Sequence, residues 1–290
     1  MDTVAVTGGN GQIGSALLAA LADRGHRTAN LSRGERRESV ADRYLRTDLL
    51  DPGEVYGSLA SADPDAVSHF GTIPRPGETP GHVTFRSNVQ TTYHVLAAAE
   101  ALDVETVVLA SSLSAMGAGF EDEIDVRYLP VDESHPLTAG NPYGLGKRVA
   151  EVVGDGFGRR EGAPTTVASL RFPLVADDAE LRETFAAADR SLDAVREAGF
   201  FETARKTLFA YVHLDDATDL AVQALEADFE GHEAVFGAAA DTTVDAPTAE
   251  LAELYDAEAS ASLEGHESLI DTGKAERLLG WSPERSWRSL

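Results

Sequence analysis

The opening of the chain, residues 4–14, constrains the fold more than any other stretch. It reads Val-Ala-Val-Thr-Gly-Gly-Asn-Gly-Gln-Ile-Gly, an apolar strand-like run that meets the spaced glycines Gly8, Gly11 and Gly14, and an apolar-periodic helical segment follows at Ala16 to Leu21. Glycines let backbone N–H groups approach a pyrophosphate closely, and the start of a helix adds partial positive charge. The stretch predicts a dinucleotide site lined by Gly8, Asn10, Gly11, Gln12, Ile13 and Gly14.

The spacing of these glycines is G-x-x-G-x-x-G, which differs from the commonest dinucleotide fingerprint, G-x-G-x-x-G. A turn of a surface hairpin is the alternative interpretation, since glycines also gather in ordinary turns. The position of the motif favours the dinucleotide site, because it follows a strand at the start of the chain and an alternation of strands and helices comes after it.

That alternation predicts the fold class. Strands are expected at 27–31, 66–69, 106–110 and 166–170, with helices at 55–60, 85–102 and 142–160 between them. Such a pattern is typical of a doubly wound parallel sheet, the Rossmann architecture, with ligands at the carboxyl ends of the strands. We expect residues 1–175 to form this domain. Residues 176–290 would form a smaller α/β substrate lobe that is interleaved with it, beginning with a charged helical segment at 180–198.

The charge balance excludes several classes of partner. The 290 residues include 49 acidic and 24 basic ones, for a net charge of -25, and this surface should repel nucleic acid and anionic membranes. Acids spread along the whole chain suggest a halophilic source, a hypothesis that unchanged stability in low salt would contradict. There is no cysteine, no histidine pattern of a zinc site, and no leader or long apolar run, so we expect a metal-free cytoplasmic protein.

Three polar residues predict the chemistry. Ser112 follows the end of the strand at 106–110, and the helix from Pro142 carries Tyr143 and Lys147, which share one face because they are four residues apart. An ammonium group near a phenol favours the phenolate, so Lys147 would make Tyr143 a usable base. Ser112 would hydrogen-bond the reacting oxygen while a nicotinamide exchanges hydride with the attached carbon. A strand end and a surface helix pair are the structural alternatives.

These motifs resemble the extended short-chain dehydrogenase/reductases of the NAD-dependent epimerase/dehydratase type. The similarity spans nearly the whole chain, and its motifs are Thr7–Gly14, Asp48-Leu49, Asn88-Val89, Ala110–Ser112, Tyr143–Lys147, Arg171–Pro173, Tyr211–Asp216 and Lys274–Trp281. The resemblance implies that Ser112, Tyr143 and Lys147 are the catalytic residues. It also implies that Asp48 and Leu49 lie against the adenine, with Thr72 beside the cofactor and Pro173 near the nicotinamide.

Some residues of these motifs have two interpretations. Asn88 would belong to the cofactor surroundings, or would cap the long helix. Asp215 and Asp216 are expected to cap a helix, and His213 to lie in or near the core.

The choice of cofactor depends on the end of the second strand. NAD-preferring members of the family usually carry an acidic residue there, whereas this chain has Ser32 and Arg33, with Arg36 and Arg37 close behind. Because an arginine suits a 2'-phosphate, NADP is favoured over NAD, although arginines also serve solubility. Comparing the Michaelis constants for the two cofactors tests this expectation.

The substrate is less well defined by the sequence. The resemblance implies a sugar, a uronate or a nucleotide sugar, and Arg75 and Arg182 are candidate contacts for an acidic group. We expect net oxidation or reduction of a secondary alcohol. A nucleotide-sugar epimerase with tightly bound NAD and a non-catalytic NAD(P) sensor are the alternatives. The family also suggests a homodimer that pairs the helices at 85–102 and 142–160, which light scattering would test.

Overall fold

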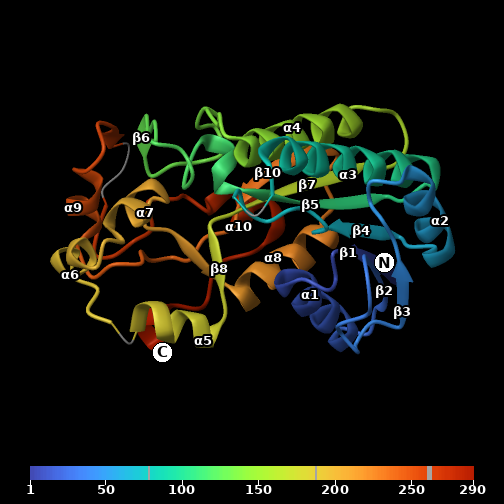
Figure 1. Ribbon diagram of the computed structural model, residues 1–290, viewed down its shortest axis with the longest axis horizontal. Helices are drawn as coiled ribbons and strands as arrows, with labels where there is room; N and C mark the ends of the chain where they lie inside the picture. Colours follow the sequence, from blue (N-terminus) through green and yellow to red (C-terminus); the bar gives the residue numbers. More distant parts are fainter. Residues whose placement is uncertain (78, 187, 260–262) are drawn as a thin grey trace.

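The core of the molecule is a seven-stranded parallel sheet (Figure 1). The computed structural model describes residues 1–77, 79–186, 188–259 and 263–290. The strand order is β10-β7-β5-β4-β1-β2-β3. The strands are β1 (Thr3–Thr7), β2 (Arg27–Ser32), β3 (Arg43–Arg46), β4 (Ala66–His69), β5 (Thr106–Ser112), β7 (Thr166–Phe172) and β10 (Gly231–Phe236). This arrangement confirms the predicted doubly wound Rossmann architecture.

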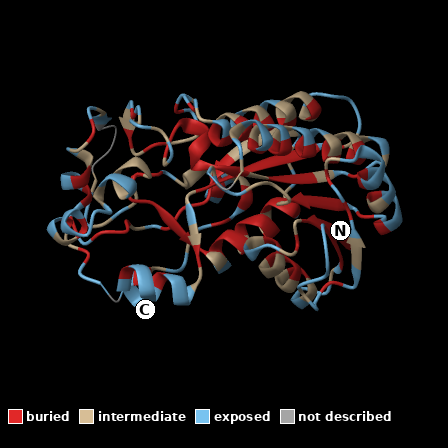
Figure 2. Cartoon of the chain, viewed as in Figure 1, coloured by how far each residue is buried: buried red, intermediate tan, exposed pale blue. Residues whose placement is uncertain are grey.

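Helices cover both faces of the sheet. One face carries α2 (Pro52–Ala62), α3 (Gly81–Ala101) and α4 (Pro142–Gly158), and the other carries α1 (Gln12–Asp23) and α8 (Leu214–Leu225). Leu17, Leu18 and Leu220 are fully buried in the core on the α1 face, and Leu59 and Leu96 are fully buried on the opposite face. Burial on both faces explains why the central strands are almost continuously apolar (Figure 2).

A second hydrophobic core lies beyond the carboxyl ends of the strands. Met116, Phe209, Leu251 and Leu269 are fully buried there. The short elements around it are η1 (Leu113–Met116), β6 (Tyr128–Leu129), α6 (Leu192–Glu197), α7 (Phe201–Lys206), α9 (Thr248–Ala252) and β11 (Glu258–Ala259). The remaining elements are β8 (Leu174–Ala176), α5 (Asp178–Leu181), η2 (Arg182–Ala186), β9 (Tyr211–His213), α10 (Gly273–Leu279) and η3 (Trp287–Ser289).

Several predicted boundaries differ from the structure. The expected helix at 180–198 is interrupted: α5, the π-helical η2 and α6 are separate elements. β3 was not predicted, because its sequence, Arg-Tyr-Leu-Arg, has charged ends and lies at the edge of the sheet. The division at residue 175 stays a prediction, yet α8 and β10 both pack with the earlier part of the chain. The chain therefore returns to the sheet after residue 175.

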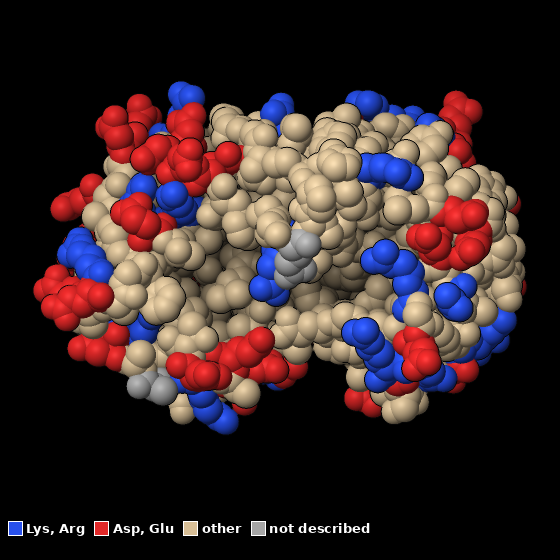
Figure 3. All heavy atoms as spheres, viewed as in Figure 1, with Lys and Arg blue, Asp and Glu red and all other residues tan. Residues whose placement is uncertain are grey.

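Acidic side chains are spread over the visible face of the molecule, with basic ones among them, and a hollow lies between its two halves (Figure 3). No helix in the described ranges is long and apolar enough to cross a membrane.

Candidate functional site

The turn between β1 and α1 has the geometry of a cradle for an anion. Gly8 has a φ of +74°, and a Cβ there would lie 2.7 Å from the backbone of Gly71, the second residue after β4. A Cβ on Gly14 would collide with the carbonyl oxygen of Gly8. The amide of Gly11 donates to Gly8 O at 2.9 Å, which closes the turn. These tight contacts fit a backbone that must approach a pyrophosphate directly at the start of a helix.

Side chains of the turn anchor it to its surroundings. Asn10 Oδ1 accepts hydrogen bonds from Asn30 Nδ2 (3.2 Å) and from the Arg37 amide (3.1 Å). Ser32 Oγ accepts from the Asn10 amide at 3.2 Å and donates to Asn30 Oδ1 at 2.7 Å. Gln12 Nε2 donates to Glu180 Oε2 at 2.8 Å, which joins the turn to α5 in the lobe. The hydroxyl of Ser32 therefore orders the turn, and its predicted contact with cofactor stays a prediction.

The structure brings Ser112, Tyr143 and Lys147 together at the carboxyl end of β5. Asn141 caps α4 by accepting from the amides of Tyr143 (3.0 Å) and Gly144 (2.9 Å), and this cap fixes the first turn of the helix. The Lys147 ammonium lies 5.8 Å from the centre of the Tyr143 ring. It donates to Thr72 Oγ1 at 3.0 Å and to Ala110 O at 2.6 Å. Ser112 reaches the Tyr143 hydroxyl by a hydrogen bond.

Burial acts on the protonation of both Tyr143 and Lys147. Burial raises the pKa of Tyr143, opposed by the hydrogen bond from Ser112 and by the positive charge of Arg75. Burial also lowers the pKa of Lys147 to about 7, against the negative charge of Glu151, which raises it. The expectation that the Lys147 ammonium makes Tyr143 a usable base stays a prediction, and burial of both groups opposes their charged forms.

The loop after β4 carries further predicted residues. Asn88 lies inside α3 and is fully buried, so its interpretation as a helix cap is wrong. Its side chain accepts from the Ile73 amide at 2.8 Å and donates to Ile73 O at 3.1 Å, which fixes the peptide next to Thr72. Pro173 lies between β7 and β8, and Arg75 is exposed on the same loop as Thr72. The contacts of these residues with cofactor or substrate stay predictions.

A cavity of about 450 Å³ opens at the carboxyl ends of β2 and β3. Its lining includes Arg33, Arg46 and Asp48. Glu54 Oε2 accepts from the amide of Asp48 at 2.7 Å and so shapes the loop that follows β3. Leu49 is buried beneath this loop, and a Cβ on Gly71 would collide with its side chain. The cavity lies at the carboxyl ends of the strands, where ligands of this fold gather, and the contact of Asp48 and Leu49 with the adenine stays a prediction.

Arg36 is not available to that cavity. Its guanidinium donates to Glu38 Oε1 at 3.1 Å and to Ala41 O at 2.5 Å, and the Glu38 side chain is only 6% exposed. Arg46, which sequence reasoning missed, lines the cavity in its place. Arg46 could have been identified from the sequence only by first recognising β3, because Arg46 is the last residue of that strand.

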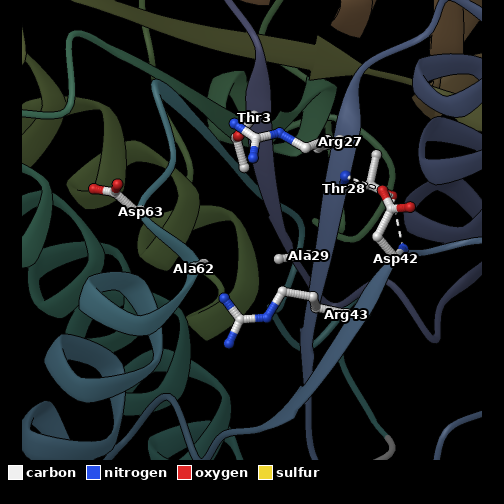
Figure 4. A pocket seen from close by; sticks show the side chains of 8 residues that line it. All are labelled: Thr3, Arg27, Thr28, Ala29, Asp42, Arg43, Ala62 and Asp63. Carbon is white, nitrogen blue, oxygen red and sulfur yellow. Dashed lines mark hydrogen bonds between the residues drawn. The ribbon is translucent and has the colours of Figure 1, made fainter.

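A second cavity lies at the amino ends of the strands, opposite to the carboxyl ends that form the candidate site (Figure 4). It measures about 130 Å³ and is lined by the first residues of three strands, Thr3, Arg27 and Arg43, together with the end of α2. Asp42 Oδ2 accepts from the Thr28 amide at 2.7 Å beside it. Because ligands of this fold gather at the carboxyl ends of the strands, this cavity is not part of the candidate site.

One polar group after residue 175 differs in role from the prediction. His213 caps α8, since its Nδ1 accepts from the Asp215 amide at 3.0 Å, so the expectation that Asp215 and Asp216 cap this helix is wrong. Arg182 is exposed and lies 3.5 Å from Asp178, and its predicted contact with substrate is untested. In the part of the chain that the structure describes, no cluster of His, Asp or Glu could hold a metal ion.

Phe120 and Glu121, which follow η1, contact the site and were not singled out from the sequence. Phe120 is half exposed and packs edge-to-face on Tyr143, with ring centres 5.7 Å apart. Its neighbour Glu121 accepts from the amides of Gly140 (2.7 Å) and Asn141 (2.8 Å), which lowers the pKa of Glu121 despite partial burial. This segment therefore holds both the ring of Tyr143 and the cap of its helix. Only the fold reveals these contacts, which join residues about 20 apart in sequence.

His69 predicts a measurable acid sensitivity. It is fully buried between Thr7 Oγ1 (2.7 Å) and Thr91 Oγ1 (3.2 Å), and burial lowers its pKa to about 3. Below the ordinary pKa of about 6.5, the unfolded chain binds a proton that the folded protein refuses. As the pH is lowered from 6.5 to 3, we expect His69 to reduce the free energy of unfolding by about 1.4 kcal/mol for each pH unit. Urea unfolding at several pH values measures it.

The substitution His69→Asn isolates this contribution. The variant should show a shallower fall in unfolding free energy with decreasing pH than the parent protein, whatever its stability at pH 7. His82→Asn, at an exposed position of α3, is the matched control and should leave the pH dependence unchanged. Parallel pH curves for His69→Asn and the parent would contradict the assignment.

The glycine turn, the parallel sheet and the Ser-Tyr-Lys arrangement together define an oxidoreductase of the short-chain dehydrogenase/reductase class. The chain belongs to the NAD-dependent epimerase/dehydratase family, whose model matches residues 4–237. This membership confirms the resemblance and the expectation of an enzyme.

Individual relatives cover almost the whole chain. A UDP-glucose 4-epimerase of Rhizobium leguminosarum bv. trifolii is 29% identical over 314 aligned residues, which cover 98% of this chain and 93% of the relative. The structure of a UDP-glucose 4-epimerase from Brucella ovis in complex with NAD has a TM-score of 0.71 at 22% identity, covering 99% of this chain and 94% of that one. A mutated uronate dehydrogenase has a TM-score of 0.68 at 21% identity, covering 99% and 83%. At this identity the two structures show the shared fold.

Proposed function

We propose that the protein catalyses net oxidation of a secondary alcohol of a sugar or sugar derivative, or the reverse reduction, with a nicotinamide dinucleotide. The observation that carries this proposal is the placement of Tyr143, Ser112 and Lys147 beside the glycine turn at one edge of the sheet. When bound, the cofactor supplies the hydride acceptor or donor. Tyr143 exchanges the proton of the substrate oxygen, and Ser112 holds that oxygen by a hydrogen bond.

Lys147 and the glycine turn have supporting roles in this proposal. The Lys147 ammonium donates to the carbonyl of Ala110 and to Thr72, and would hold a hydroxyl of the bound cofactor by a further hydrogen bond. Gly8, Gly11 and Gly14 would leave the backbone free to bind the pyrophosphate. Arg75, whose charge reaches the Tyr143 hydroxyl, is the candidate partner for an acidic group of the substrate.

The basic residues of the lobe favour a substrate without a nucleotide diphosphate. Arginines are the side chains best suited to hold a diphosphate, yet most of those in the lobe already have partners. The pairs are Arg196 with Asp193, Arg205 with Glu123 and Glu202, Arg285 with Asp215 and Asp216, and Arg288 with Asp241 and Asp245. Arg190 donates to Thr243 O and is 9% exposed. These arrangements support net oxidation of a simple sugar or uronate.

A nucleotide-sugar 4-epimerase is the second candidate, because the relative from Rhizobium leguminosarum bv. trifolii aligns over nearly all of the chain. A screen of aldoses, uronates and nucleotide sugars with NAD and NADP, followed at the nicotinamide absorbance band in high salt, separates the two. Accumulation of reduced cofactor with an aldose or uronate is expected. Conversion of a nucleotide sugar without net reduction, by protein purified with bound nicotinamide, would overturn the proposal in favour of the epimerase.

We further propose a preference for NADP, supported by Arg33 and Arg46 in the cavity at the ends of β2 and β3. Two guanidinium groups there suit a 2'-phosphate. Because a hydrogen bond to a charged group contributes about 1.5–3 kcal/mol, Arg33→Ala and Arg46→Ala should each raise the KM for NADP roughly tenfold or more and leave that for NAD nearly unchanged. Arg37→Ala, outside the lining, is the control. A parent enzyme that prefers NAD would contradict the proposal.

A further inference from the structure

A buried ion pair lies behind the Ser-Tyr-Lys group and has no part in the proton exchange proposed above. Glu151 follows Lys147 by one turn of α4, and its carboxylate accepts from Arg171 Nε at 3.0 Å and Nη2 at 2.8 Å. The two side chains are 6% and 5% exposed. Ser111 Oγ donates to the same carboxylate at 2.5 Å. Side chains from α4, β5 and β7 therefore converge on Glu151.

These contacts lead directly to the site. Ser111 precedes Ser112, and Lys147 donates to the carbonyl of Ala110, the residue before Ser111. Through Ser111, Glu151 thus holds the last residues of β5, which include Ser112 and the Ala110 carbonyl that accepts from Lys147. Removing a charged carboxylate from water costs free energy, and a buried ion pair often contributes little to net stability. The negative charge of Glu151 is therefore better explained by its effect on neighbouring groups.

The charge of Glu151 is the negative one that acts on Lys147. The two hydrogen-bond acceptors of the ammonium, Thr72 Oγ1 and Ala110 O, are neutral oxygens. Burial lowers the pKa of Lys147 to about 7, and the Glu151 carboxylate raises it. The other titratable or charged groups around it are Tyr143 on α4, His69 on β4, which burial keeps neutral with a pKa of about 3, and Arg171 on β7, which is bound to Glu151.

We propose that Glu151, held by Arg171 and Ser111, is a positioning residue that keeps the Lys147 ammonium charged and in place at the edge of the sheet. Its significance for turnover rests on the proposed function, whereas its effect on the ammonium does not. The effect of Glu151 on the ammonium and its effect on turnover can therefore be tested separately.

The test uses the small number of lysines. The chain has only Lys147, Lys206 and Lys274, so selective 13C labelling of the lysine ε-carbons gives three NMR signals, and Lys147→Arg identifies the relevant one. In the folded protein, the Lys147 signal should titrate near pH 7. In Glu151→Gln the midpoint should fall by about one pH unit, because a nearby opposite charge shifts a buried group by about 1–3 units. The matched control is Glu100→Gln, which breaks the exposed pair with Arg160 and should leave the midpoint unchanged.

A second variant protects the test from loss of folding. Glu151→Gln leaves Arg171 buried without its charged partner, which destabilises proteins strongly. The double variant Glu151→Met with Arg171→Met removes both charges and should fold, and it should also show the lowered Lys147 midpoint. Unchanged midpoints in the folded variants would overturn the proposal.

The consequence for turnover is measured after the substrate screen. As the pH rises, kcat/KM should begin to fall at a lower pH in the double variant than in the parent. This shift should follow the shift of the NMR midpoint. A profile that keeps its shape and position while only its height falls would indicate a merely structural pair and would overturn the positioning role. Absence of turnover in the parent enzyme would count against the proposed function and would leave the NMR test of Glu151 intact.

Discussion

Replacing Tyr143 with Phe is expected to lower kcat by about 10²–10⁴-fold, the usual contribution of a positioned proton donor or acceptor. The substitution removes only the hydroxyl that Ser112 contacts, while the ring keeps its edge-to-face packing on Phe120. Stability and dinucleotide affinity should therefore change little. Steady-state kinetics with the substrate found by the screen, together with dinucleotide titration followed by protein fluorescence, measure both effects.

The matched control for this prediction is Tyr93→Phe. Tyr93 lies on α3 and packs on Phe157, near the end of α4 opposite to Tyr143, so its ring lies away from the proposed proton exchange. It should retain the kcat of the parent. Undiminished turnover in Tyr143→Phe would remove the tyrosine from the chemistry and with it the proposed mechanism.

The second large effect is expected from Gly14→Ala. The added Cβ would collide with Gly8 O and would lie 2.9 Å from Gly9 Cα, both of them backbone atoms that cannot rotate away. Overpacking of this kind costs about 1–3 kcal/mol. Relief requires the turn to move, so dinucleotide affinity should fall by at least about tenfold, which corresponds to 1.4 kcal/mol. Urea unfolding and fluorescence titration with NAD and NADP measure the two losses.

Gly156→Ala provides the comparison within the same protein. Gly156 lies in α4, where a Cβ would meet no other atom within 4 Å. Alanine should stabilise the protein there by about 0.4–1 kcal/mol through the unfolded state. Equal affinities for dinucleotide in Gly14→Ala and Gly156→Ala would show that the glycine turn does not bind the cofactor.

Much of the fold could be predicted because its central strands are buried on both faces and read as apolar runs. β3 and β10 were harder to place, since both lie at edges of the sheet and carry charged or polar residues such as Arg43 and His232. The break in the helix expected at 180–198 also left no clear signal, as its composition is charged and helix-forming throughout.

The candidate site also contains some residues that could be predicted from the sequence and others that could not. Tyr143 and Lys147 could be paired from their spacing, because four residues is one turn of a helix. The partners of that pair could not: Glu151 meets Arg171 and Ser111, and Asn88 meets Ile73, only after β4, β5, β7 and two helices have packed. The burial of Tyr143, which raises its pKa, could not be foreseen either, because neighbours in sequence do not reveal loss of solvent.

The chain returns to the sheet after it has built part of the lobe. β10 pairs with β7, α8 packs on α1, and the indole of Trp281 near the C-terminus donates to Asp216 O at 3.0 Å. A gene segment ending near residue 175 would encode a sheet without β10 and α8, with an open edge at β7, a common cause of aggregation. Exchange of a whole module between genes at that position would therefore break the sheet.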